Sequence, residues 1–446
     1  MMKKCWMAAI LLAVTFCLSG CLFNASVEEL YSLPQLPPEY TALRERIDAI
    51  MAGGGEYAAP QSGSNIQPVQ MVDLDGDGEE EALAFMRRSA DERPLKIYIF
   101  RSVGDSYEEA AVIEGSGSAI YSISYTDMNQ DGMQELIVGW RVSTELQALT
   151  VYSLKDFQPV ELLRNTYSRY AVRDLNQDGM QELVMIRSDD QGNTVADYYV
   201  WNDQTLVQRP SANISVSIAE LSSGRVRSGM LEGGVPALFV TGVEDSLFQV
   251  TDILAVKNDE LVNITMNNAT GVSTEIFRYQ PLFPTDIDGD GLTEVPAPFD
   301  LAGWGSTDAC YSINWRRYDI NGSPTLAIST YHDAADGWYL ILPEEWKKRV
   351  TVSRDDSDPD EVAVTFAIQG SDTELYQEFL KIYAISGSSP EYRITQGSRF
   401  LLSRQAETIF AGELLDANES WEFGITEDEL RSSFKLIVTE WASGDD

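Results

Sequence analysis

Short runs rich in apolar residues recur along much of the chain, and turn residues separate them. Four such runs follow one another at Ala119–Tyr125, Glu135–Trp140, Leu149–Ser153 and Pro159–Leu163. Short apolar runs bounded by turn residues predict β-strands. The pattern begins again at Tyr170–Arg173 and Leu183–Ile186. We therefore predict a repeated unit of four short strands.

The two ends of the chain have different patterns. Leu43, Ile47, Ile50 and Met51 have helical spacing, which predicts a helix over 41–51 that ends at the following glycines. After residue 330, strands are predicted at Trp338–Ile341, Glu361–Ile368, Leu380–Ile385, Phe400–Ser403 and Thr408–Leu415. Thr426 and the acids after it predict a last helix that runs to Trp441. We interpret this segment as a small α+β domain.

The first residues have the features of an export signal. Met1–Lys4 is a short basic head, and Trp6–Leu18 is an apolar stretch shorter than the roughly 18 residues of a membrane helix. Leu18–Cys21 resembles the lipobox of bacterial lipoproteins, in which the cysteine is acylated and becomes the first residue. We therefore predict a signal peptide over 1–20, a lipid on Cys21 and a linker with a short helix over 21–58. The alternative is an ordinary secretory signal.

An acidic nine-residue sequence occurs four times, with the form acid-x-acid/amide-x-Asp-Gly-x-x-Glu. The copies span 73–81, 127–135, 174–182 and 286–294, so their starts are 54, 47 and 112 residues apart. Since 112 is twice 56, one unit lacks the acids, and Glu232–Pro236 stands near its expected place. Each acidic loop is predicted to lie between the first and second strands of a unit.

The spacing of oxygen atoms in each loop fits a hard cation. Positions 1, 3 and 5 direct oxygens to one side, glycine at position 6 permits a sharp turn, position 7 offers a backbone carbonyl and the glutamate at position 9 closes the cage. Calcium, with about six to eight oxygen ligands, suits this better than magnesium. We expect about four calcium ions, the alternative being solvated acidic turns. The predicted metal residues are Asp73, Asp75, Asp77, Glu79, Glu81, Asp127, Asn129, Asp131, Met133, Glu135, Asp174, Asn176, Asp178, Met180, Glu182, Asp286, Asp288, Asp290, Leu292 and Glu294.

Four-stranded units that carry these loops, followed in the second copy by Leu136–Gly139, resemble the FG-GAP/VCBS repeats of integrin-like propellers. The resemblance implies calcium that rigidifies hairpins and partners that bind a propeller face. We therefore predict a mainly β chain: a β-propeller of about five four-stranded blades over 59–330, or six if residues 203–274 contain two, and then the α+β domain over 331–446. The propeller followed by Gly337–Trp338 and Leu342–Trp346 also resembles uncharacterised lipoproteins of Firmicutes, which implies no activity.

The composition of the chain argues against several classes of function. The chain has 446 residues and a formal charge of −38, from 32 basic and 70 acidic residues, which argues against nucleic acid as a partner. Its single histidine, His332, leaves little material for histidine-based zinc sites or catalytic triads. Of its four cysteines, only Cys310 would remain unmodified in the mature chain, so no disulfide is expected within it.

These features predict a lipoprotein on the outer face of the bacterial membrane that binds a protein or a glycan without catalysis. The alternatives are a propeller-based hydrolase or lyase with carboxylate groups, and an accessory subunit of an envelope complex. No catalytic residue is assigned.

Several residues outside the acidic loops are predicted to have structural roles. Glu344 and Glu345 follow a proline at a helix start, where carboxylates complement the helix dipole. Asp355–Asp360 is predicted to be a solvated loop, and His332 a residue of the domain junction. Trp140 and Trp201 are expected to pack in cores, Cys310 is expected to be a buried small side chain, and Trp304 is the best candidate for an exposed aromatic residue.

Overall fold

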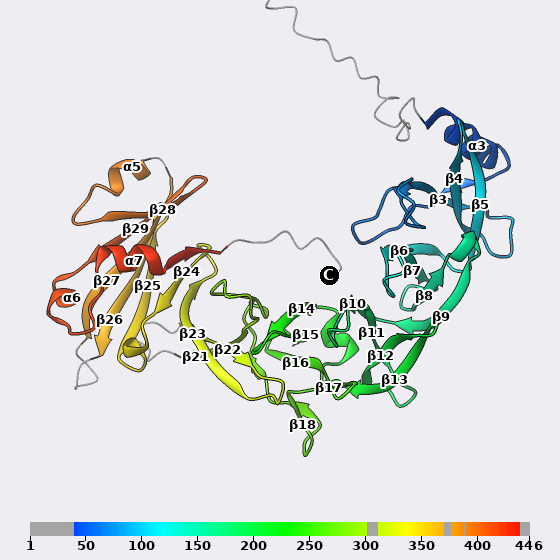
Figure 1. Ribbon diagram of the computed structural model, residues 1–446. Helices are drawn as coiled ribbons and strands as arrows, with labels where there is room; N and C mark the ends of the chain where they lie inside the picture. Colours follow the sequence, from blue (N-terminus) through cyan, green and yellow to red (C-terminus); the bar gives the residue numbers. More distant parts are fainter. Residues whose placement is uncertain (1–39, 301–310, 370–375, 388, 438–446) are drawn as a thin grey trace, which may run out of the picture.

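A computed structural model describes residues 40–300, 311–369, 376–387 and 389–437. The chain is mainly β, with repeated four-stranded antiparallel sheets of the kind that form propeller blades (Figure 1). The export signal, Cys21, Trp304, Cys310 and Trp441 lie outside the described residues. None of the helices in the described ranges combines the length and the apolar character needed to cross a membrane.

The first three sheets each contain consecutive strands in chain order. The first contains β2 (Val69–Val72), β3 (Glu81–Arg87), β4 (Leu95–Val103) and β5 (Ser106–Gly115), and β1 (Glu56–Tyr57) also pairs with β3. The second contains β6 (Ala119–Thr126), β7 (Glu135–Arg141), β8 (Gln147–Ser153) and β9 (Val160–Tyr167), with the 3-10 turn η2 (Lys155–Phe157) before β9. The third contains β10 (Arg169–Arg173), β11 (Glu182–Ser188), β12 (Thr194–Asn202) and β13 (Thr205–Asn213). The strands predicted for residues 119–186 are confirmed.

The fourth sheet arises from the unit without an acidic loop. It contains β14 (Arg225–Leu231), β15 (Val235–Glu244), β16 (Phe248–Lys257) and β17 (Glu260–Asn263), and β20 (Ile276–Arg278) also pairs with β16. Helix α4 (Ile218–Leu221) precedes it, and a ribbon of β18 (Met266–Asn267) and β19 (Val272–Ser273) follows. Residues 203–274 therefore contribute one four-stranded sheet, not two.

The fifth sheet continues past the predicted domain boundary. It contains β21 (Val295–Asp300), β22 (Tyr311–Tyr318), β23 (Pro324–Asp333), β24 (Trp338–Leu342) and β30 (Phe434–Leu436). A bridge between Thr285 and Glu294 takes the place of the first strand of this unit. Residue 330 lies inside β23, so the boundary predicted there falls within a strand.

Successive sheets lie next to one another along an arc that is open in the view of Figure 1. Separate apolar cores fill the spaces between neighbouring sheets. Trp140 of the second sheet is fully buried, and its ring occupies the space above Gly115 of the first, where an added Cβ would lie 2.2 Å from the ring. Helix α3 (Thr41–Ala52), as predicted, covers the first sheet with Leu43 and Ile47.

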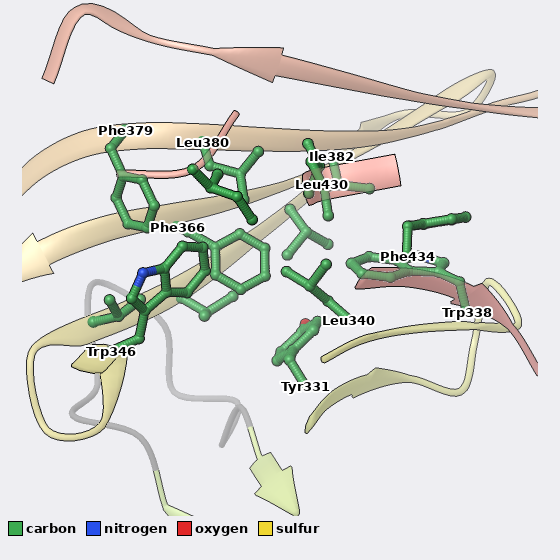
Figure 2. Packing of buried hydrophobic residues seen from close by; sticks show 14 of the residues in the cluster. Tyr331, Trp338, Leu340, Trp346, Phe366, Phe379, Leu380, Ile382, Leu430 and Phe434 are labelled. Carbon is green, nitrogen blue, oxygen red and sulfur yellow. The ribbon is translucent and has the colours of Figure 1, made fainter. Parts of the chain in front are cut away.

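The last sheet contains five strands in the order β25-β26-β27-β29-β28. These are β25 (Val350–Asp358), β26 (Glu361–Gln369), β27 (Tyr376–Ile385), β28 (Phe400–Gln405) and β29 (Thr408–Leu414), accompanied by η3 (Glu344–Trp346), α5 (Pro390–Arg393), α6 (Asp416–Ser420) and α7 (Glu427–Ser433). Its aromatic core, with Trp346 against Phe379 at 4.9 Å between ring centres, also includes Tyr331 and Trp338 of the fifth sheet (Figure 2). The last two sheets therefore share one core.

Two predictions for the C-terminal segment were wrong. The last helix ends at Ser433, and Phe434–Leu436 forms β30 against β24. The edge of β24 offers backbone groups to pair, and Phe434 stacks on Trp338 at 5.4 Å, which outweighs the helical spacing. The acids at 355–358 belong to strand β25, not to a loop.

Candidate metal centres

The acidic loops lie where the repeat predicts them. Residues 73–81 connect β2 to β3, residues 127–135 connect β6 to β7, and residues 174–182 connect β10 to β11. Residues 286–294 lie between the Thr285–Glu294 bridge and β21, the corresponding place in the fifth sheet. Each loop therefore precedes the second strand of its unit.

All four loops have the same backbone arrangement. At position 1, an aspartate oxygen accepts a hydrogen bond from the N–H of the glycine at position 6, over distances of 2.8 to 3.0 Å. At position 5, an aspartate accepts from the N–H of position 7, over 2.8 to 2.9 Å. The position 6 glycines have φ between 86° and 92°, a region that residues with a side chain avoid, which explains the glycine in every copy.

The glutamates at position 9 are buried and close the loops. Glu81, Glu135, Glu182 and Glu294 are at most 4% exposed. One carboxylate oxygen of each accepts a hydrogen bond from the N–H of position 2, at 2.9 Å in the first three loops and 3.1 Å in the fourth. Burial raises the pKa of each to about 7 against the lowering effect of this hydrogen bond, and neighbouring aspartates raise it further.

Three loops gather enough carboxylates to hold a metal ion. The clusters are Asp73, Asp75 and Glu81, then Asp174, Asp178 and Glu182, then Asp286, Asp288 and Asp290, with the oxygens of each within 4.8 Å of one another. In the third loop, a buried Asp174 oxygen has no hydrogen-bond partner, so an acceptor is available for a cation. In the second and third loops, the asparagine at position 3 donates a hydrogen bond to the aspartate at position 5, at 3.1 and 2.9 Å. Oxygen-only donor sets of this kind fit hard cations.

The loops also connect neighbouring sheets, which the sequence did not reveal. The N–H of Gln134 donates to the carbonyl of Leu74 at 2.8 Å, and that of Gln181 donates to Met128 at 2.9 Å. The side chain of Gln177 donates to the carbonyl of Gly234 at 3.0 Å. Position 8 of one loop therefore contacts position 2 of the preceding loop.

The unit without the acidic motif also contacts the loops on both sides of it, through the Gln177 side chain of the third loop and through a backbone bond to the fourth. Its turn is closed by a hydrogen bond from the N–H of Gly234 to Leu231 at 3.0 Å. The carbonyl of Met230 accepts from the N–H of Thr293 in the fourth acidic loop at 2.9 Å. This turn therefore lies between the third and fourth acidic loops although it lacks their acids.

The side chain of Arg317, which the sequence analysis did not identify, lies among the carboxylates of the fourth loop. Arg317 on β22 is 2.9 Å from Asp288, 3.0 Å from Asp290 and 3.4 Å from Glu294, measured between nitrogen and carboxylate oxygen. The sequence contains a basic residue in the third strand of this unit. Its position beside the loop depends on the pairing of β21 with β22, which the sequence alone does not give.

Several acidic residues outside the loops are exposed or in ion pairs. Glu344 and Glu345 are exposed in η3, as expected for acids in a first helical turn. Asp333 and Asp336 both pair with Arg354.

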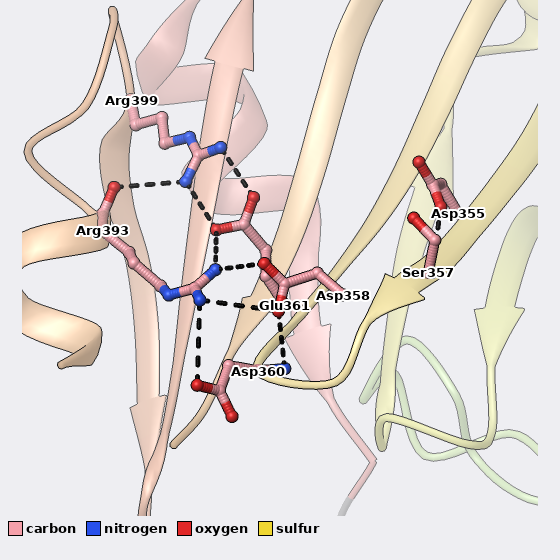
Figure 3. Close-up of polar contacts among 7 residues, drawn as sticks. All are labelled: Asp355, Ser357, Asp358, Asp360, Glu361, Arg393 and Arg399. Atoms are coloured by element: carbon pink, nitrogen blue, oxygen red, sulfur yellow. Dashed lines mark hydrogen bonds and ion pairs between the residues drawn. The ribbon is translucent and has the colours of Figure 1, made fainter. Parts of the chain in front are cut away.

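Figure 3 shows that the acids at the end of β25 also have partners. Asp358 and Asp360 pair with Arg393, and Glu361 pairs with both Arg393 and Arg399. The arginines join α5 and the segment after it to the β25–β26 hairpin, so we interpret these acids as structural.

His332 lies in β23 among aromatic rings. It stacks on Tyr339 at 4.9 Å between ring centres, and its Nδ1 is 3.0 Å from the hydroxyl of Thr330. Burial lowers its pKa to about 4.

A cavity of about 180 Å³ lies between the second sheet, the third sheet and α4. The residues that line it include Glu145, Arg169 and Ile218.

No protein-family model matches the chain, and no curated protein is similar to it in sequence. Solved structures that resemble it include a hypothetical protein from Leishmania major, with a TM-score of 0.22 and 10% identity over 65% of this chain and 94% of that one. Another is an exo-β-1,3-galactanase from Phanerochaete chrysosporium determined with β-1,3-galactotriose, with a TM-score of 0.24 and 8% identity over 81% of this chain and 90% of that one. These likenesses carry no argument about function.

Proposed function

We propose that the chain is a calcium-stabilised surface lipoprotein that binds a protein or a glycan through its array of sheets and catalyses no reaction. The proposal rests on the repeated acidic loops, because four copies share one backbone arrangement and three of them gather carboxylates around a common point.

Calcium is the cation that we assign to the loops. Each loop offers side-chain oxygens at positions 1, 3, 5 and 9, and a larger hard cation accepts such irregular oxygen cages better than magnesium does. The charge of the loops also supports a cation, since a buried glutamate lies among aspartates in every copy, and burial together with the repulsion of these aspartates raises its pKa. In the first loop, Asp73, Asp75 and Glu81 would hold the ion.

Calcium would act on the junctions between sheets as well as on the loops. The hydrogen bonds of Gln134 and Gln181 connect each loop to the preceding one, so a loop held in one conformation also holds its neighbour. A site with a dissociation constant of about 10⁻⁴ M in about 1 mM calcium contributes about 1.4 kcal/mol to stability. Several sites would supply a substantial part of the stability of an ordinary domain.

The anchor and the partner complete the proposal. Acylation of Cys21 would attach the chain to the outer face of the membrane, and the linker over 21–58 would connect it to the sheets. Rigid sheets in series present a long surface to a protein or a glycan, as in other repeat proteins.

Calcium titration of the chelated full-length chain tests the metal role. The melting temperature should rise as calcium is added, and Asp174→Ala should reduce the rise, whereas Asp190→Ala, which changes an acid outside the loops, should not. Binding to surface proteins or glycans should then be measured with and without calcium. An unchanged melting temperature would contradict the calcium role, and turnover of a glycan would contradict the absence of catalysis.

A further inference from the structure

The fourth acidic loop differs from the other three because a cationic side chain already lies inside it. The guanidinium of Arg317 is within 3.4 Å of carboxylate oxygens at positions 3, 5 and 9 of the loop, from Asp288, Asp290 and Glu294. The Arg317 side chain is 23% exposed and Glu294 is fully buried. These carboxylates are three of the predicted calcium ligands.

The arginine reaches the loop because of strand pairing. Val295 pairs with Arg316 across β21 and β22, so Arg317 lies one residue further along, opposite Glu294 at the end of the loop. The corresponding residues follow Tyr152 and Tyr199 in the second and third sheets, where they are Ser153 and Val200 and carry no charge.

The first sheet provides a comparison with the same residue type. Ala82 pairs with Phe100, so Arg101 has the place that Arg317 has in the fifth sheet. Arg101 is half-exposed, lies 3.9 Å from Glu108 and is 6.0 Å from the ring centre of Phe157, away from the first loop. An arginine at this place therefore does not enter the loop by default.

We propose that Arg317 is the resident cation of the fourth loop and excludes calcium from it. An arginine keeps its charge at any accessible pH, and its planar nitrogens match several carboxylates at once. Because Arg317 belongs to the adjacent strand, it competes with a free ion at a high effective concentration. Calcium could enter only if the guanidinium left all three carboxylates. The inference rests on the calcium role proposed above and changes the expected number of ions from four to at most three.

The charge of the loop supports this assignment. The fourth loop has four carboxylates, from Asp286, Asp288, Asp290 and Glu294, and the positive charge of Arg317 balances part of their charge within the chain. At the corresponding place the second and third sheets have the uncharged Ser153 and Val200, and Arg101 of the first sheet pairs with Glu108. The facing strand therefore supplies a positive charge to the fourth loop and none to the second and third.

Calcium stoichiometry of the full-length chain, measured by equilibrium dialysis, tests the inference. Asp75→Ala and Asp288→Ala remove the same position from the first and fourth loops. We expect Asp75→Ala to lower the number of bound ions by one and Asp288→Ala to leave it unchanged. Equal losses in both variants would overturn the role of Arg317. Absence of calcium binding by the unmodified chain would instead contradict the proposed function.

Removal of the arginine provides the second arm. Arg317→Gln should raise the number of bound calcium ions by one, and the added ion should be lost again in Arg317→Gln combined with Asp288→Ala. Arg101→Gln is the matched control, which removes the same charge at the same place of the first sheet and should change nothing. Circular dichroism in calcium identifies any variant that fails to fold. A folded Arg317→Gln chain without the additional ion would refute the inference.

Discussion

Replacement of a closing glutamate by glutamine should have opposite effects on stability with and without calcium. Glu135 is 1% exposed and accepts a hydrogen bond from the N–H of Met128 at 2.9 Å, which the carbonyl of a glutamine can also accept. In the calcium-free chain, burial and the loop aspartates raise the pKa of Glu135 to about 7 from its ordinary value of 4.5. Its charged form therefore destabilises the folded state.

The magnitude follows from the two pKa values. Above pH 7 the carboxylate is charged in both states, and a difference of about 2.5 pKa units corresponds to about 3 kcal/mol of lost stability. As the pH falls from 7 to 4.5, the folded state takes up a proton before the unfolded state does, so this loss disappears. Glu135→Gln should therefore stabilise the calcium-free chain by up to about 3 kcal/mol at pH 8 and by little at pH 4.

With calcium the sign should reverse, because the amide cannot supply the charge that balances the ion. Urea unfolding followed by tryptophan fluorescence measures both conditions, at pH 8 with a chelator and with calcium. Glu108→Gln, which changes an exposed acid outside the loops, serves as the control. Equal destabilisation by Glu135→Gln in the two conditions would refute the reasoning.

Three further changes test other parts of the structure. Gly115→Ala should cost about 1–3 kcal/mol in urea unfolding because its Cβ would meet the Trp140 ring at 2.2 Å, and the exposed Ser116→Ala should cost little. Arg354→Met should cost about 3 kcal/mol because Asp333, 5% exposed, would lose its partner, with Arg404→Met at a surface pair as the control. His332→Gln should flatten the fall in stability from pH 6.5 to 4, since only the unfolded state of the natural chain binds a proton to His332 over that range. Parallel acid-unfolding curves would contradict this last expectation.

The features that the sequence predicted well are local. A turn of nine residues contains its own acids and its own glycine, so its shape in the structure follows from the motif alone. Strands such as β6 and β7 are short runs rich in apolar residues and lie on either side of such a turn, so their positions were predictable as well.

The features that the sequence did not predict depend on distant partners. Phe434 has helical spacing with Leu430, yet it forms a strand because it pairs with Leu340, which is far away in the chain. The acids of β25 had the composition of a loop, and one of them, Asp358, pairs with Arg393, which follows it by 35 residues. Arg317 follows Asp288 by 29 residues, and only the pairing of β21 with β22 brings the two together.

These observations suggest why a repeat protein can lose metal ligands and keep its architecture. The contacts between consecutive loops use backbone groups, such as the N–H of Thr293 and the carbonyl of Met230, which survive any exchange of the acidic side chains. The acids add repulsion that a cation must balance, and the chain has three ways to meet this requirement. The first and third loops gather carboxylates that could hold an added ion, the fourth receives Arg317, and the turn at 232–236 has only one acid, Glu232. Under the proposed function, dependence on calcium would therefore differ from one junction to the next while the order of the sheets stays the same.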